Sequence, residues 1–404
     1  MSRKVVVIGH GYTSRLGVIR ALGRAGYEVI VIVMANIRRD GTLNTSRPID
    51  CYSKYVSRVL YCPSDQERLI TTLLEECADP DQKVILFPDS DFSVAVIDEN
   101  QELLRGKFEF PSINHQPGAI VTWMNKLRQK EVAKEVGLNV ADGVIVDVKD
   151  GKYELPSGIE YPCFPKPLST VVGGKRGLRR CNDERQLRQT LTCIISYYPD
   201  IKILVEDYKP IETEYALQGF TDGKEVFIPG IIKILSLAGG GHFGVAKQGM
   251  IMPVEGFEDL LELFKAFVLK TGFEGIFDID FYNTGGEFYF CEMNFRYGGS
   301  GYAYTASEVN LPIIAVRHLI GEPYAEAMRY VSSASVFVNE RMCRDDWMDG
   351  LISSGMFHKL LRSADISFIA DDFDPEPETV FKNSLKGFKK NSKRIVKRLL
   401  RRHR

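Results

Sequence analysis

The chain has 404 residues, of which 44% are hydrophobic and 26% are charged, and its formal net charge is −1 at pH 7. These values are typical of an ordinary soluble globular protein that is long enough for two or three domains. No apolar run approaches the ~20 residues that span a bilayer, and the N-terminus lacks the pattern of a signal peptide. The eight cysteines are scattered without a Cys-x-x-Cys pair, so we expect a cytoplasmic protein and neither a disulfide framework nor a zinc site.

Residues 4–33 predict a strand, a glycine-bearing turn, a helix and a second strand, which is how a parallel α/β sheet begins. Gly9 and Gly11 in the turn resemble a dinucleotide-binding fingerprint, but Ser14 stands where its third glycine belongs. No acidic residue ends the second strand. An NAD(P)- or nucleotide-sugar-binding oxidoreductase is therefore the alternative hypothesis.

A second unit, residues 84–91, begins with a predicted strand and places Asp89 and Asp91 at the carboxyl end of that strand. Open α/β sheets bind their ligands at the carboxyl ends of their strands. These two aspartates are therefore placed where a ligand is expected.

Residues 119–140 predict a charged amphipathic helix that ends at Gly137. It carries Lys126, which is either a solvated helix lysine or a ligand-binding lysine. Further on, residues 163–177 predict a short strand with Lys166 between two prolines, followed by a glycine-rich loop. Glycines let backbone N–H groups approach phosphate oxygens and a lysine adds a point charge, so we favour a phosphate-binding loop over a plain surface loop.

The most informative segment is 291–300, Cys-Glu-Met-Asn-Phe-Arg-Tyr-Gly-Gly-Ser. Glu292 and Asn294 lie two apart on a predicted strand, so both point to one face. The strand before it carries Asp278 and Asp280, and residues 283–286 supply the turn. With a regular four-residue loop, Asp280 would face away from Glu292. A loop with an odd number of residues, or a bulge at one of the glycines, would bring the two aspartates, Glu292 and Asn294 to one face.

Carboxylate and amide oxygens on one face form a site that suits Mg²⁺, which completes its coordination with water and phosphate. The alternative from this segment alone is an ordinary amphipathic hairpin with an exposed acidic edge.

The Glu-x-Asn-x-Arg strand behind an Asp-bearing strand resembles the ATP-grasp superfamily of ligases. The resemblance covers roughly residues 1–330. It implies an α/β and α+β protein, with a Rossmann-like pre-ATP-grasp domain followed by a two-subdomain ATP-grasp fold. It further implies ATP and Mg²⁺ (or Mn²⁺) as cofactors.

The resemblance also implies roles for individual residues. Metal ligands would be Asp280, Glu292 and Asn294, and Arg296 would face the transferred phosphate or the substrate. Lys233 is not part of this resemblance; we propose it as a contact of the transferred phosphate because it stands at the end of an apolar run. Nucleotide-binding residues would be Lys126, Lys166, Ser169, Gly173, Gly174, Glu206, Tyr208 through its backbone, and Glu214 on the ribose, with Glu212 as its rival.

The domain boundaries that we expect are 1–115 for the first domain and 116–330 for the ATP-grasp domain, with a mobile lid at about 150–205. An extension would cover 331–378 and a basic tail 379–404. The implied activity is a carboxylate–amine ligase that works through an acyl phosphate and releases ADP and phosphate. The narrower resemblance is to bacterial D-aspartate ligase, so an amino acid or a cell-envelope precursor would be the substrate, with no specific nucleic acid partner. A homodimer remains open.

Residues 381–404 contain eleven Lys or Arg and no acid, and they leave the rest of the chain at −12. Apolar residues at helical spacing predict a cationic amphipathic helix, which could lie on an anionic membrane at the inner face. A flexible basic tail that aids solubility is the alternative. Co-sedimentation with phosphatidylglycerol vesicles, comparing the full chain with one that stops at Glu378, tests this: equal binding would exclude the tail as an anchor.

Overall fold

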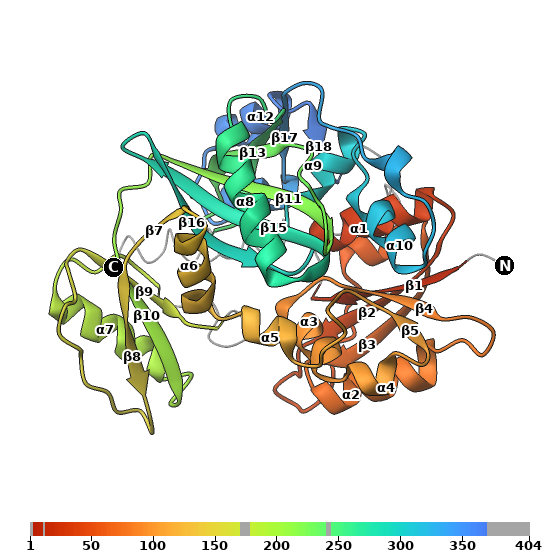
Figure 1. Cartoon of the computed structure of the whole chain (residues 1–404), viewed down its shortest axis with the longest axis horizontal. Coiled ribbons are helices and arrows are strands. Elements are labelled where there is room, and N and C mark those ends of the chain that lie inside the picture. Colours follow the sequence, from red (N-terminus) through yellow and green to blue (C-terminus); the bar gives the residue numbers. More distant parts are fainter. Residues whose placement is uncertain (1–2, 11–12, 170–177, 240–243, 370–404) are drawn as a thin grey trace.

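A computed structural model gives the structure, and it describes residues 3–10, 13–169, 178–239 and 244–369. The described chain forms three sheets, which Figure 1 shows as an N-terminal sheet, a small sheet and a large central sheet. Among these residues, no helix is long and apolar enough to cross a bilayer. The predicted mixture of α/β and α+β parts is confirmed.

The N-terminal sheet has five parallel strands in the order β3-β2-β1-β4-β5. Its apolar runs are buried on both faces, as expected for parallel strands covered by helices. The strands are β1 (Lys4–Gly9), β2 (Glu28–Ala35), β3 (Val56–Pro63), β4 (Val84–Pro88) and β5 (Phe108–Glu109). The helices of this domain are α1 (Thr13–Arg24), α2 (Gln66–Thr72), α3 (Asp91–Glu99) and α4 (Gln101–Leu104).

The small sheet consists of three antiparallel strands, β8 (Gly143–Val148), β10 (Ile201–Asp207) and β9 (Cys163–Pro167), in that order. Helix α7 (Glu184–Ile195) packs its apolar side on one face and buries a separate core there. The other face carries Lys166 and Glu206. Strand β9, helix α7 and most of β10 lie within residues 150–205, where we expected the lid, whereas β8 precedes that range.

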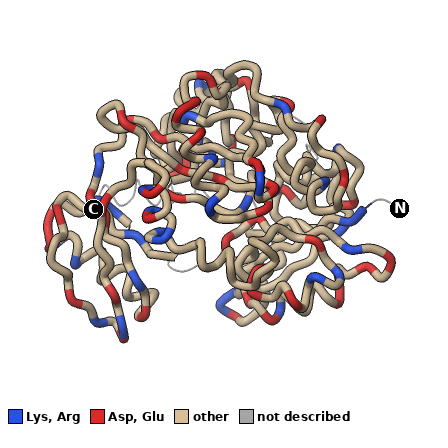
Figure 2. Tube along the Cα trace, in the orientation of Figure 1, with Lys and Arg blue, Asp and Glu red and all other residues tan. Residues whose placement is uncertain are grey.

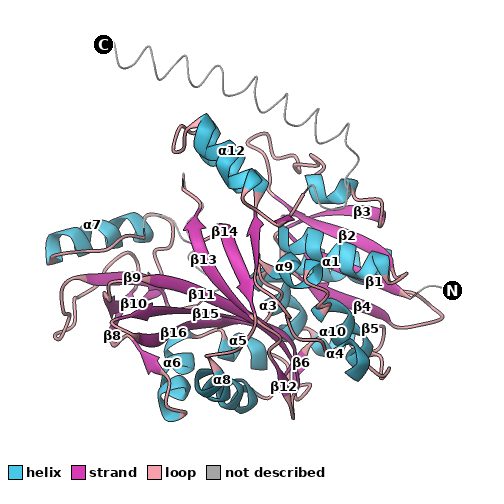
Figure 3. Cartoon of the chain, turned by 90° about the horizontal axis from the view of Figure 1, so that it is seen from above, coloured by secondary structure: helices cyan, strands magenta, loops and turns pink. Residues whose placement is uncertain are grey.

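The large sheet follows the order β18-β17-β14-β13-β11-β15-β16-β7. Helices α6 (Lys126–Glu135) and α8 cover one of its faces, as Figure 3 shows from above, and the N-terminal domain with α9 and α10 packs against the other. Its strands are β7 (Asn139–Val140), β11 (Thr213–Asp222), β13 (Ile231–Leu237), β14 (Ala246–Met252), β15 (Phe273–Thr284), β16 (Glu287–Asn294), β17 (Ser335–Val338) and β18 (Ile366–Ser367), with β6 (Ser112–Ile113) and β12 (Val226–Phe227) pairing beside this path. The helices are α8 (Glu258–Thr271), α9 (Gly301–Ala306), α10 (Leu311–Leu319), α11 (Glu340–Met348) and α12 (Ser354–Arg362).

Two predicted elements differ from the structure. The single helix expected over 119–137 is two helices, α5 (Ala119–Trp123) and α6 (Lys126–Glu135). The break is at Asn125, whose side chain accepts hydrogen bonds from the first backbone N–H groups of α6 and so starts a new helix. The extension predicted after residue 330 joins the large sheet through β17, which pairs with β14. The basic tail lies outside the described residues.

Candidate active site

The hairpin of β15 and β16 has the irregularity that the metal hypothesis required. Its turn is the two-residue pair Gly285–Gly286, both with positive φ, and a bulge interrupts the pairing at Cys291. Asp280 pairs directly with Glu292, and Asp278 pairs with Asn294. Directly opposed residues share a face, so the four oxygen-bearing side chains lie together. The bulge itself was predicted, but its position at a glycine was wrong.

The outer edge of β16 is held by the side chain of Gln129, which is fully buried on α6. Its Oε1 accepts the Met293 N–H at 2.8 Å, and its Nε2 donates to the Met293 carbonyl at 2.9 Å and to the Trp123 carbonyl at 2.8 Å. Met293 stands between Glu292 and Asn294. The Gln129 side chain therefore bonds the β16 backbone as a paired strand would, between the candidate metal ligands Glu292 and Asn294.

We expect Gln129→Leu to lower the free energy of unfolding by about 2–4 kcal/mol, because it leaves three buried backbone groups without partners. Gln189→Leu on α7 is the matched control, since that glutamine is exposed and its loss should cost less than about 0.5 kcal/mol. Denaturant unfolding of the three proteins measures both values. Equal stability of the two variants would contradict the role of Gln129.

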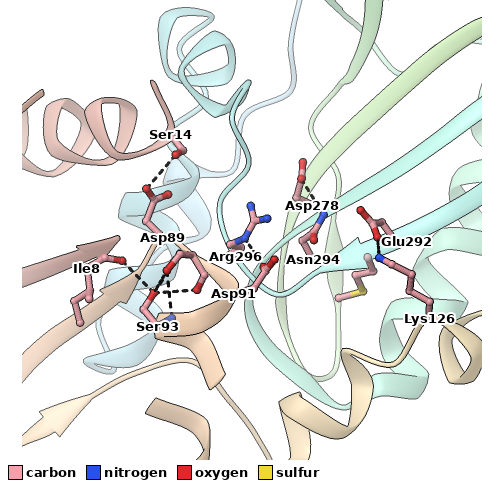
Figure 4. A network of polar contacts seen from close by, with 12 residues as sticks. Ile8, Ser14, Asp89, Asp91, Ser93, Lys126, Asp278, Glu292, Asn294 and Arg296 are labelled. Atoms are coloured by element: carbon pink, nitrogen blue, oxygen red, sulfur yellow. Dashed lines mark hydrogen bonds and ion pairs between the residues drawn. The ribbon is translucent and has the colours of Figure 1, made fainter. Parts of the chain in front are cut away.

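Helix α6 also brings Lys126 to the hairpin. The Lys126 ammonium group forms an ion pair with Glu292, and both side chains are largely buried. The Lys126 N–H donates to the Leu168 carbonyl at 3.0 Å, and Ser169 pairs with Asn125. The base of the predicted phosphate loop therefore lies beside the first turn of α6, and Figure 4 shows Lys126 directed at Glu292.

Two lysines meet the carboxylate of Glu206 on the open face of the small sheet. Lys166 Nζ lies 2.8 Å from Glu206 Oε1, and Lys130 pairs with the same oxygen. Burial opposes the charge on Glu206, but the two ammonium groups outweigh it and lower the pKa of this carboxyl. Lys166 also lies within electrostatic range of Cys291 and Asp280 on the hairpin. The lysines of the small sheet and the carboxylates of the large sheet thus face one site, where Figure 2 shows basic and acidic segments side by side.

Asp278, one of the four side chains on this face, belongs to a buried polar cluster. Burial, and then the neighbouring Asp280 carboxylate, raise the pKa of Asp278. The side chain of Gln218, its partner on β11, is fully buried and has no hydrogen-bond partner in the described structure. A Cβ on Gly298 would lie 2.4 Å from Asp278 Oδ1, so only glycine lets the segment after β16 approach this closely.

Arg296 connects the hairpin to the N-terminal domain. Its Nε donates to Asp91 Oδ1 at 2.6 Å, and the two residues lie at the facing edges of the two domains in Figure 4. Burial opposes the charge on the guanidinium, but Asp91 and Asp278 raise the pKa of Arg296. The aspartates predicted at the carboxyl end of β4 therefore do reach the site.

Three residues that we predicted to bind the nucleotide, Tyr208, Glu212 and Glu214, differ in how they are placed to do so. The backbone N–H of Tyr208 already donates to the Pro162 carbonyl at 2.9 Å, which leaves its carbonyl for a ligand. Glu212 accepts the Gly285 N–H at 3.1 Å and so belongs to the hairpin turn. Glu214 pairs with Tyr282 on the same face as Asp280, and because Glu212 is held in the turn, Glu214 stays the residue that we predict for the ribose.

Lys233 is not brought to this face. It pairs with Tyr215, and Tyr215 stacks on Phe281 on the opposite side of the sheet, against α8. The apolar run before Lys233 could not reveal its face, because strands alternate and the register was unknown. We therefore leave Lys233 out of the candidate site. Gly173 and Gly174 lie outside the described residues.

The sequence reasoning did not select Lys130, Gln129 and Gln218. Gln129 and Lys130 lie on the predicted helix, and Gln218 lies on β11, for which no strand was predicted. None of the three belongs to a motif, and only their burial distinguishes them. A polar residue on the apolar side of an amphipathic helix was the one available signal, and it applies to Gln129 and Lys130.

Comparison with known proteins agrees with this architecture. The chain is 25% identical over 214 residues to the carbamoyl phosphate synthase large chain of Gemmatimonas aurantiaca, and 30% over 184 residues to that of Clostridium botulinum. These matches cover 52% and 44% of this chain. The chain belongs to the ATP-grasp superfamily.

This ATP-grasp chain spans about a fifth of the length of those relatives, 19% and 17%. No family model matches it. The narrower likeness to D-aspartate ligase stays a prediction.

Solved structures share the ATP-grasp fold across most of the chain. The biotin carboxylase domain of 2-oxoglutarate carboxylase from Hydrogenobacter thermophilus, a dimer with MgADP, has a TM-score of 0.61 and 20% identity, and 83% of this chain and 74% of that one are covered. L-amino acid ligase from Bacillus licheniformis has a TM-score of 0.59 and 16% identity, with 83% and 79% covered. N5-carboxyaminoimidazole synthetase from Staphylococcus aureus with ADP has a TM-score of 0.60 and 16% identity, with 84% and 83% covered. At these identities, the likeness establishes the fold alone.

Proposed function

We propose that the protein is an ATP-dependent carboxylate–amine ligase that forms an acyl phosphate and releases ADP and phosphate. One observation carries the proposal: Lys126 and Lys166, from two separate elements, converge on the face that presents Asp280, Glu292 and Asn294. A nucleoside triphosphate with Mg²⁺ requires cations for its phosphates and oxygen ligands for the metal around one site. ADP in the solved relatives of the same fold supports this.

The residues present fit the metal. Two carboxylates and an amide share one face. Among the described residues, no three His, Cys, Asp or Glu side chains are grouped so that they could hold a metal ion by themselves, so phosphate and water would have to complete the coordination. An open set of this kind suits Mg²⁺ or Mn²⁺, which takes one or two carboxylates and completes its shell with phosphate and water. When bound, the ion would neutralise charge on the phosphate oxygens. Asp280, Glu292 and Asn294 would hold it.

Direct attack of an amine on a carboxylate fails near neutral pH because oxide is a poor leaving group, and phosphorylation of the carboxylate removes this obstacle. The chain's own contribution is positioning and charge. In this proposal Lys166 and Lys126 exchange their carboxylate partners for phosphate oxygens, while Arg296 faces the transferred phosphoryl group. Glu206 keeps Lys130 as its partner after Lys166 turns to the nucleotide. Glu214 accepts hydrogen bonds from the ribose.

A screen of amino acids and small carboxylates for ATP-dependent release of ADP and phosphate, with Mg²⁺ present, tests the proposal. We expect release that requires both an acid and an amine. An absorbance change with NAD(P)H in place of ADP release would favour the oxidoreductase hypothesis, which gains no support from the comparisons above. Contact of the basic tail with an anionic membrane, a homodimer, and an amino acid or envelope precursor as substrate remain predictions.

A further inference from the structure

The N-terminal sheet has a topological switch point at the site. The chain runs from β1 to β2 and β3 on one side of the sheet, whereas β4 and β5 lie on the other side of β1. The crevice outside the carboxyl ends of β1 and β4 is where open α/β sheets bind ligands. Gly9 ends β1 and Asp89 follows β4 at this crevice.

Asp89 is 8% exposed, and its two carboxyl oxygens differ. Oδ2 accepts a hydrogen bond from Ser14 Oγ at 3.0 Å, whereas Oδ1 is buried and has no partner among the described residues. In Figure 4 the second oxygen points to the side on which Arg296 and Asp91 lie. Buried polar atoms in folded proteins normally have a hydrogen-bond partner, so a further donor is expected at this oxygen.

The nearest cations are already committed to other carboxylates. Arg15 is fully buried, pairs with Asp50 and donates to the Gly9 carbonyl at 2.7 Å. Arg296 pairs with Asp91. Burial raises the pKa of Asp89 to about 7, and these two arginines oppose that rise only in part. The carboxyl group therefore has room for one more positive partner.

We propose that Asp89 and Asp91 form a subsite for the cationic amino group of the acceptor substrate. An ammonium group has three donors and matches the acceptor oxygens of two carboxylates. Arg296 lies between this subsite and the ligand face of the hairpin, since it contacts Asp91 and stands two residues after Asn294. The inference rests on the proposed function, and it names the class of acceptor as a small cationic amine.

The test uses the full chain saturated with MgADP and isothermal titration with a panel of amines, namely the twenty amino acids, ethanolamine and putrescine. Each amine that binds is compared with its hydroxyl analogue, for example alanine with lactate. We expect at least one amine to bind, its hydroxyl analogue to bind at least tenfold more weakly, and Asp89→Asn to weaken the amine at least tenfold. Asp79→Asn is the matched control, because Asp79 pairs with Lys4 at the opposite end of β1.

Titration of MgADP itself separates the two proposals. Three results would show that the subsite is wrong while the proposed function stands. MgADP binds but no amine does; the hydroxyl analogue binds the unaltered protein as tightly as the amine does; or Asp89→Asn binds the amine as tightly as the unaltered protein does. If MgADP does not bind, both fall. If Asp89→Asn fails to fold, Asp91→Asn, at a more exposed position, gives the same comparison.

Discussion

We expect Glu292→Gln to lower the turnover for ADP release at least about a hundredfold while the protein stays folded. The amide keeps the shape of the side chain but removes a charge that would bind the metal, and metal stabilisation of phosphoryl transfer amounts to several kcal/mol. The same change leaves Lys126 without its carboxylate partner. Asn294→Ala should act in the same direction, because Asn294 lies on the same face opposite Asp278.

Glu287→Gln is the matched control for this prediction. It lies five residues earlier on β16, is exposed, and its carboxylate accepts only the hydroxyl hydrogen of Tyr289 in the described structure. Its turnover should equal that of the unaltered protein. Steady-state ADP release measures the turnover of each protein, and circular dichroism shows whether it is folded. Near-normal turnover of Glu292→Gln would contradict the metal assignment.

The second large effect is expected on nucleotide binding. Lys166→Met should raise the Kd for ADP about 10- to 100-fold, because a charge-assisted hydrogen bond to phosphate contributes about 1.5–3 kcal/mol. Lys166→Arg keeps the charge but presents a planar fork, so we expect an intermediate Kd. Titration calorimetry with MgADP measures all three values.

Lys202→Met serves as the control for Lys166, because Lys202 lies on β10 in the same small sheet and is exposed. Its Kd should be unchanged. The fold should tolerate Lys166→Met, since Glu206 retains Lys130 as its partner. An unchanged Kd in Lys166→Met would mean that Lys166 points away from the phosphates and would remove it from the site.

The sequence predicted those strands and helices whose formation depends mainly on the pattern of their own side chains. The apolar runs of β1, β2 and β4 and the alternation in the hairpin strands were readable, because burial of a strand depends on its own side chains. The Glu-x-Asn-x-Arg spacing placed Glu292 and Asn294 on one face for the same reason. The break at Asn125 was readable in principle as a helix cap, yet the charged pattern on either side concealed it.

The tertiary structure alone decided which faces meet. The bulge at Cys291 brings Asp280 opposite Glu292, and no residue type marks that position, because a bulge is set by the pairing of two strands. The same dependence on register removed Lys233 from the site. The packing of helix α6 against β16 and the small sheet brought in Gln129 and Lys130. The sequence by itself determined several strands, including the strand that carries Lys166, and the motif of residues 291–300. Pairing between distant segments determined the site, because a strand's own sequence does not specify its partner or its register.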